Sequence, residues 1–235
     1  KKPFDGLTGF VPHIYRGRLD NDMYTVIYWN LFGLENAKTI MTDCKLKSDA
    51  DGEFIRTKFR FIGKKVLCLA KASVDYRIDE NGKIRITAKL KKTFPLTAKL
   101  PRFGVHCEFD PEFKDVAYYG RGPVENYSDF KEHSPIGRYE YAVCDMAHKY
   151  IKPQDSGNRG DTRESALVAE DAKITFRADG KPFSFNANPF TLGQLKKAKH
   201  IEDLPDVETA FTAVDGFVAG TGTGSCGPGP AKEHT

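Results

Sequence analysis

The 235-residue sequence lacks any apolar run of membrane-spanning length, and Lys1 to Phe4 does not resemble a secretion signal. It also lacks an excess of charge of one sign, because 36 basic residues face 32 acidic ones. These charges are spread along the chain, and the clusters Lys89 to Lys92 and Lys196 to Lys199 are interpreted as solvated faces. We therefore expect no nucleic-acid partner and no membrane partner. The expected compartment stays open between cytoplasm and periplasm, for a soluble protein.

Cysteine and tryptophan are scarce. The five cysteines are odd in number, widely spaced and without a Cys-x-x-Cys pair, which argues against zinc and thioredoxin-like sites. Trp29, the one tryptophan, stands among Tyr28, Leu31 and Phe32. Such an indole either stacks on a sugar or, more often, belongs to a core.

Strand patterns dominate what is present. The turn Asp79-Glu80-Asn81-Gly82 carries the Asn-Gly pair typical of a hairpin. Few helices are expected: Thr191 to Lys199 has Thr191 as a cap with Gln194 as its reciprocal partner, and Thr25 to Phe32 is ambiguous. The chain therefore favours an all-β, antiparallel sandwich. Strands are predicted at Phe54 to Ile62, Lys65 to Ala70, Ala72 to Ile78, Ile84 to Leu90, Phe103 to Phe109, Asp115 to Tyr119, Gly137 to Val143, Lys173 to Arg177, Phe183 to Asn186 and Thr209 to Ala219.

The segment from Gly120 to Phe130 does not have ordinary loop chemistry. Gly120 and Gly122 precede Pro123, and three polar side chains that can bond to backbone follow it, namely Glu125, Asn126 and Asp129. Such residues fix a corner of a β protein through side-chain to backbone hydrogen bonds.

The same segment resembles the G-x-G-P-x-E-N-Y-x-D stretch in the C-terminal domain of family 2 β-galactosidases. Four further segments resemble that family in the same order, so the likeness covers residues 13 to 230. They are Arg16 to Asp22 with the following Trp29 and Gly33-Leu34, Leu100 to Gly104, Tyr150 to Arg163, and Asp215 to Pro228.

The resemblance implies a large two-sheet antiparallel β-supersandwich of the galactose-mutarotase-like type. Residues 1–12 would then be a linker from a preceding domain, and 13–235 the sandwich, with its last strand missing. Independently of the resemblance, the strands predicted on both sides of Lys91 to Pro101 indicate a crossing between two sheets of one domain rather than a linker between halves.

The resemblance also implies that catalysis and closure of the active site belong to different domains. The family's catalytic glutamates lie in a TIM barrel of the same chain, so this part would have no catalytic residue and would close one side of the active site. The intact enzyme would hydrolyse terminal non-reducing β-D-galactose residues of a β-galactoside substrate with retention. No cofactor is expected in these residues, although the intact enzyme could use Mg²⁺ or Na⁺ and could be a homo-oligomer.

Five residues are expected to bind substrate. In many relatives a Ser-Trp pair in the last loop faces the sugar beyond the scissile bond, and Ser225-Cys226 stands in its place. The trio Asp20-Asn21-Asp22 belongs to the opening motif. Its two carboxylates could share one face of an extended segment, hold a metal, or fix a turn that supports an adjoining domain.

Two other functions stay open. An autonomous carbohydrate-binding module would need no hydrolase, and a sugar epimerase of the same fold would need an acid and a base across the sugar ring. His106 and Glu108, two residues apart on a predicted strand, could face one side of a sheet. Cys226 would be a nucleophile only beside a base, and the interpretation as a small side chain bordering substrate is preferred.

Overall fold

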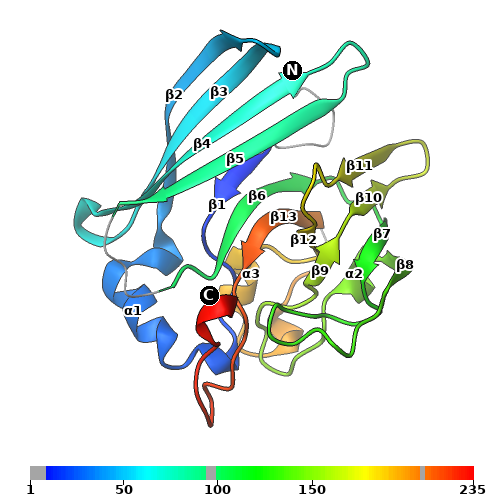
Figure 1. Cartoon of the computed structure of the whole chain (residues 1–235). Helices are drawn as coiled ribbons and strands as arrows, with labels where there is room; N and C mark the ends of the chain where they lie inside the picture. Colours follow the sequence, from blue (N-terminus) through cyan, green and yellow to red (C-terminus); the bar gives the residue numbers. More distant parts are fainter. Residues whose placement is uncertain (1–8, 94–98, 207–209) are drawn as a thin grey trace. The chain divides into compact units, whose positions relative to one another are not determined.

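The computed structural model describes residues 9–93, 99–206 and 210–235. It divides into two compact units. The main unit comprises Lys1–Tyr24 and Leu100–Thr235, and the inserted unit is Thr25–Lys99. Figure 1 labels the elements of both units. Among the described residues, no helix has the length and apolar character needed to cross a membrane.

Within its described residues, the main unit is built on two antiparallel sheets. Short helical segments occupy its connections: η1 (Asp20–Asp22), α2 (Val143–Met146), α3 (Leu192–Lys197), η4 (Ile201–Asp203) and η5 (Lys232–His234). In sheet order, the first sheet contains β1 (Val11–His13), β6 (Arg102–Phe109), β13 (Ala210–Val218), β12 (Phe183–Asn188) and β9 (Arg159–Thr162). The second contains β11 (Lys173–Arg177), β10 (Glu164–Val168), β7 (Asp115–Arg121) and β8 (Ile136–Ala142).

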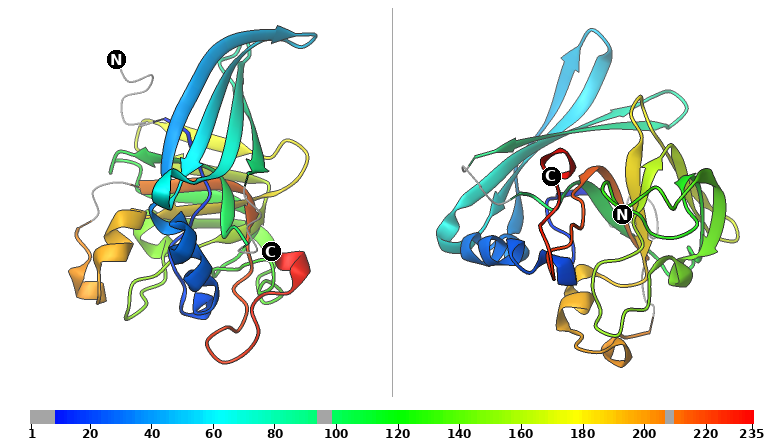
Figure 2. Two further views of the ribbon diagram at one scale, coloured as in Figure 1. Left: turned by 90° about the vertical axis from the view of Figure 1, so that its left-hand side faces the viewer. Right: turned by 60° about the horizontal axis from the view of Figure 1, so that its bottom comes forward.

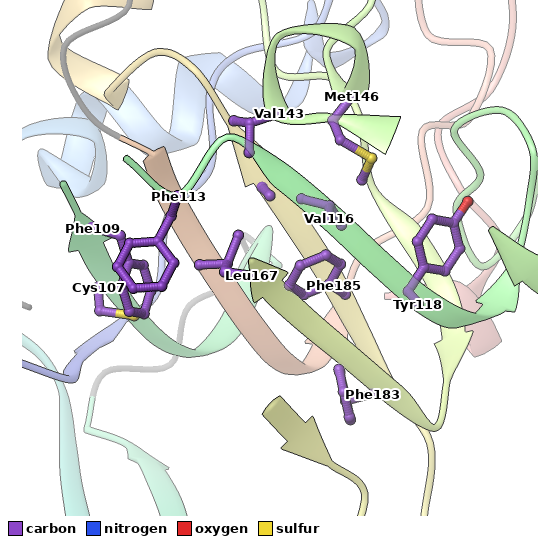
Figure 3. Packing of buried hydrophobic residues seen from close by; sticks show 11 residues of the cluster. Cys107, Phe109, Phe113, Val116, Tyr118, Val143, Met146, Leu167, Phe183 and Phe185 are labelled. Atoms are coloured by element: carbon purple, nitrogen blue, oxygen red, sulfur yellow. The ribbon is translucent and has the colours of Figure 1, made fainter. Parts of the chain in front are cut away.

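The core of the main unit lies between these sheets. Alternate residues of each strand point inward, so Phe109 and Phe185 from the first sheet meet Val116 and Leu167 from the second (Figure 3). Leu167 and Phe185 are fully buried. Helix α2 adds Val143 and Met146 to the same cluster. The expected all-β sandwich class is confirmed.

The inserted unit is a four-stranded antiparallel meander preceded by a helix. In chain order it contains α1 (Thr25–Phe32), η2 (Leu34–Asn36), β2 (Lys38–Asp49), β3 (Gly52–Ile62), η3 (Lys64–Val66), β4 (Cys68–Ile78) and β5 (Ile84–Lys92). Its long strands form one twisted ribbon, seen from two further sides in Figure 2. The predicted hairpin turn is confirmed, with Gly82 in the left-handed region at φ 77°.

The structure tests the predictions for the two helical segments and for the strand at Lys65 to Ala70. Thr25–Phe32 is a helix, and Trp29 is buried in its own unit with Nε1 donating to the Lys99 carbonyl at 3.1 Å, so the core interpretation holds. The Thr191–Gln194 capping box is present. The predicted strand at Lys65 to Ala70 is wrong at its start, because Lys64–Val66 is a 3-10 turn with Lys65 at φ 50°.

The strand predicted at Thr209 to Ala219 begins one residue outside the described part, and β13 starts at Ala210. Residues 1–8 of the predicted linker and residues 94–98 of the predicted crossing also lie outside it. The domain limits, including a missing last strand, stay predictions.

Candidate functional site

The trio Asp20-Asn21-Asp22 forms a 3-10 turn, which is the turn alternative rather than an extended segment. Asp22 is 5% exposed and accepts the Leu19 amide at 2.7 Å. Both of its oxygens also accept from the Arg16 guanidinium, at 2.6 and 3.0 Å. Burial alone would lower the pKa of Arg16, but the Asp22 carboxylate raises it above the ordinary value. Asp22 therefore holds the turn in place.

Asn21 joins this turn to the glycine-rich loop at the end of the chain. Its Nδ2 donates to the Gly222 carbonyl at 2.8 Å, and its Oδ1 accepts from Ser225 Oγ at 2.9 Å. The loop passes so close that a Cβ on Gly224 would lie 2.3 Å from the Asn21 carbonyl oxygen. Two of the predicted segments, about 200 residues apart in sequence, are thus in direct contact.

Asp129 fixes the other side of the same loop. Its Oδ1 accepts the Thr221 amide at 2.9 Å and its Oδ2 accepts the Gly222 amide at 2.7 Å. A Cβ on Gly220 would lie 2.4 Å from the Asp129 carboxyl carbon. Sequence reasoning assigned Asp129 to a corner and missed this contact with the site; the available signal was its place in the shared motif.

Glu125 and Asn126 make the corner that the sequence predicts. Asn126 is fully buried, accepts the Gly160 amide at 2.8 Å and donates to two carbonyls of its own segment. Glu125 accepts the Gly157 amide at 2.8 Å and the Tyr150 hydroxyl. Burial first, and then this bond to Glu125, raise the pKa of Tyr150. The expectation of side-chain to backbone bonding is confirmed.

Asp20 is exposed and is hydrogen-bonded to a residue that lines a pocket. Its amide donates to Gln154 Oε1 at 3.0 Å, and Gln154 Nε2 donates to its Oδ2 at 3.3 Å. Gln154 in turn lines a pocket of about 270 Å³ together with His148, Tyr150 and Phe190. Leu195 of α3 and Ile201 of η4 line it with apolar side chains, and polar groups such as that of His148 also line it, a composition typical of small-ligand sites.

Cys226 and Ser225 are exposed at the tip of the loop. Within the described part of the chain, Cys226 Sγ has Ser225 Oγ as its polar neighbour at 4.0 Å, and no histidine ring is hydrogen-bonded to it. A thiol activated for catalysis requires such a base or another positive group. The arrangement suits a small side chain that borders a ligand.

A second buried polar cluster lies on the sheet face that points away from the core. His13 Nε2 and Asp215 Oδ1 are 2.6 Å apart, and Arg102 Nε lies 3.1 Å from the other oxygen of Asp215. Beyond Arg102, Asp155 accepts the Gly17 amide at 3.3 Å, and burial raises the pKa of its carboxyl group. Sequence reasoning missed this cluster, because its members come from four separate segments.

His106 adjoins the cluster, with its ring 5.0 Å from that of His13. Burial, and then the neighbouring His13, lower the pKa of His106 to about 3. An imidazole that is neutral at pH 7 can accept a proton but is not an imidazolium acid, so His106 alone does not supply the acid–base pair that an epimerase requires. The lowered pKa of His106 therefore does not favour the epimerase hypothesis.

No group of three His, Cys, Asp or Glu side chains in the described ranges is placed to hold a metal ion. Asp22 is bonded to Arg16, and Asp20 to Gln154, so this pair does not form a ligand set.

Comparison with known proteins gives a consistent family. Residues 4–235 match the family model described as beta galactosidase small chain. The chain is 30% identical over 218 residues to a Beta-galactosidase of Lactobacillus delbrueckii subsp. bulgaricus, which covers 91% of this chain and 21% of that protein. It is 29% identical over 209 residues to a Beta-galactosidase of Lactococcus lactis, covering 88% and 20%.

A third relative, a Beta-galactosidase of Staphylococcus xylosus, is 25% identical over 216 residues, covering 92% of this chain and 22% of that protein. The chain thus spans about a fifth of the length of the curated relatives that it matches.

Proposed function

The chain belongs to the β-galactosidase small-chain family, and from this premise we propose that it forms the C-terminal domain of a retaining family 2 β-galactosidase. The intact enzyme hydrolyses terminal non-reducing β-D-galactose residues. Retaining hydrolysis uses two carboxyl groups about 5 Å apart, one as acid and base and one as nucleophile. In this proposal both belong to a TIM barrel elsewhere in the longer chain.

The role of this domain is to close and shape one side of the active site. The contact of Asn21 with Gly222 and Ser225 supports this role, because it holds two distant segments as one rigid rim. Asp20, Asn21, Ser225 and Cys226 would contact the sugar beyond the scissile bond. Asp22, whose carboxylate is bonded to Arg16, would position the turn. Cys226 offers no stacking surface, so the rim would accept varied leaving groups.

Helix α1 offers a face for the barrel. Ile27 and Leu31 are 62% and 64% exposed, and Tyr28 beside them is 48% exposed, while Val26 and Trp29 on the opposite side are buried. An exposed apolar stripe on a helix is typical of a protein-contact surface. It is consistent with a partner domain that covers it in the longer chain.

The direct test is an assay on a chromogenic β-galactoside. The chain alone should show no turnover, whereas the full-length protein should be active. In the full-length protein, Asn21→Ala should raise KM or lower kcat several-fold, because the rim loses both bonds to the loop. The matched control is Asn81→Ala, at an exposed position in the turn between β4 and β5.

Turnover by the chain alone that depends on one of its own carboxylates would overturn the proposal. So would identical kinetics of the two asparagine variants across several leaving groups.

The pocket beside Asp20 favours one rival, an autonomous carbohydrate-binding module. Calorimetry with galactose and lactose separates the two. A module would bind either sugar with a measurable enthalpy in the chain alone. Under our proposal the chain alone gives none, since half of the sugar site belongs to the barrel.

A further inference from the structure

Charge is unevenly divided between the two units. Thr25–Lys99 contains 16 basic and 8 acidic residues, and the rest of the chain contains 20 basic and 24 acidic residues. The inserted unit is therefore strongly positive and the main unit is negative, although the whole chain is near balance. The division is not obvious in the sequence, because residues of both charges are spread along the whole chain and are separated by uncharged residues.

The strand register gathers the positive charge on one face of the inserted sheet. Along β3, Arg56, Lys58 and Arg60 alternate with Thr57 and Phe59, which are buried on the opposite face. Cross-strand partners share a face, so the register extends the row to the other three strands. We call this surface the basic face; its cations are Lys38, Lys45, Lys47, Arg56, Lys58, Arg60, Lys71, Arg77, Arg85, Lys89 and Lys91.

Some of these cations have carboxylate partners. Arg56 pairs with Asp75 at 2.6 Å. Lys45 and Lys58 flank Asp43 at 3.4 and 3.7 Å. Asp43, Asp49 and Asp75 are the acidic residues that the register places on the basic face, and Asp49 is ion-paired with Arg77. They leave most of the positive charge without compensation.

The centre of the face is a row of like charges. Arg60 on β3 is directly opposite Lys71 on β4, which is directly opposite Lys91 on β5. All three are exposed, and among the described residues none is ion-paired. Like charges directly opposite one another destabilise a sheet. A negatively charged partner would remove this cost.

The face has no exposed aromatic ring to stack on a base or a sugar. Its one aromatic residue, Phe54, is buried and covered by the guanidinium groups of Arg56 and Arg77 at 4.9 and 4.4 Å from the ring centre. Proteins that bind single-stranded nucleic acid use exposed aromatic rings to stack on the bases. The chemistry instead fits a surface of carboxylates.

The main unit has such a surface at one end of its second sheet. The turn between β6 and β7 contains Asp110 and Glu112 and leads into Asp115. Asp115 is paired with Val168, the last residue of β10, so the following turn with Glu170 and Asp171 lies beside it. We call these five residues the acidic edge. Two basic residues, at 114 and 173, interrupt it.

We propose that the basic face of one copy of this chain binds the acidic edge of a second copy. Charge complementarity between the two surfaces supports the pairing, and the row Arg60–Lys71–Lys91 is its centre. Because the two surfaces differ, the contact is head-to-tail. Such a contact depends on salt, since the Debye length falls from about 10 Å at 0.1 M to about 3 Å at 1 M.

Sedimentation velocity of the whole 235-residue chain tests the proposal. At about 0.05 M salt we expect association that rises with protein concentration, and at about 1 M salt a monomer. The variant R60E/K71E/K91E should stay monomeric at low salt, and so should D115K/E170K/D171K. An equimolar mixture of the two variants should associate again, because the reversed charges complement each other.

The matched control is K181E/K197E/K199E, which reverses three exposed lysines of the main unit and should associate like the wild type. Circular dichroism and urea unfolding check that each variant is folded. A wild-type chain that stays monomeric at low salt overturns the proposal. Retention of duplex DNA by the wild type but not by R60E/K71E/K91E, without self-association, also overturns it and assigns the face to a nucleic acid.

Discussion

Arg16 and Asp22 form a two-bond ion pair that is almost completely withdrawn from solvent. The two nitrogen–oxygen distances are 2.6 and 3.0 Å, and the side chains are 1% and 7% exposed. Because Asp22 also accepts the Leu19 amide, the pair sets the position of Asn21 between them in the chain. The candidate rim therefore depends on a buried ion pair.

We expect Asp22→Ala to destabilise the chain strongly. Removing one partner of a buried ion pair leaves an uncompensated charge and costs about 3–5 kcal/mol. Urea unfolding of the chain at pH 7 measures this loss. The control is Asp43→Ala at the exposed lysine pairs, where a surface ion pair contributes about 0–1 kcal/mol.

The double variant Arg16→Met with Asp22→Leu sharpens this prediction. Two apolar side chains leave no unpaired charge, so its stability should exceed that of Asp22→Ala. If the double variant is less stable than Asp22→Ala, the loss of stability in Asp22→Ala does not come from an unpaired buried charge on Arg16.

Asp129→Ala should loosen the glycine-rich loop without unfolding the sheets. The Thr221 and Gly222 amides lose their acceptors, which costs about 1–3 kcal/mol locally. Hydrogen exchange should therefore quicken at these two amides by at least tenfold, while amides of β12 and β13 keep their protection. Asp51→Ala, at an exposed turn, is the control. Equal exchange in both variants would show that Asp129 does not hold the loop.

Sequence reasoning found many of the strands in which apolar residues alternate with polar ones, and β3 is a clear example. β3 alternates between buried aromatic residues and exposed cations, and the pattern is visible in the sequence. β2, by contrast, was missed. It is an edge strand whose residues are nearly all exposed, so no apolar alternation marks it, and its pairing with β3 alone defines it.

The site was predictable only as separate segments. Asp20 to Asp22 and Ser225-Cys226 were identified from the motifs that carry them. What could not be predicted is that Asn21 bonds Ser225 and that Asp129 bonds Gly222, because these pairs are 204 and 93 residues apart. Such contacts follow from the order of strands in the sheets, which no local spacing records.

Gly224→Ala should displace the loop from the turn. Its Cβ would lie 2.3 Å from the Asn21 carbonyl oxygen, a backbone atom that cannot rotate away. Gly229→Ala in the same loop is the control, since nothing lies within 4 Å of its added Cβ. In the full-length protein we expect Gly224→Ala to impair hydrolysis of β-galactosides and Gly229→Ala to leave it unchanged. The opposite ranking would contradict the close approach of loop and turn.

His106 should make the chain less stable in acid. Its pKa is about 3 in the folded chain, where burial and His13 oppose protonation, against an unperturbed value of about 6.5 in the unfolded chain. Between these values the unfolded chain binds more protons, so this contribution is complete above about pH 6.5 and is lost as the pH falls toward 3. The loss is on the order of a few kcal/mol.

The variant His106→Phe isolates this contribution from that of other titrating groups, since Arg102 and Asp215 also face the ring. The free energy of unfolding of the variant relative to wild type should rise as the pH falls from 7 to 4, because the variant has no imidazole to protonate on unfolding. Val124→Ala, an exposed substitution that removes no titrating group, should show a constant difference over the same range. A constant difference for His106→Phe as well would mean that folding does not shift the pKa of His106, and the argument from a neutral His106 against ring-opening chemistry would fail.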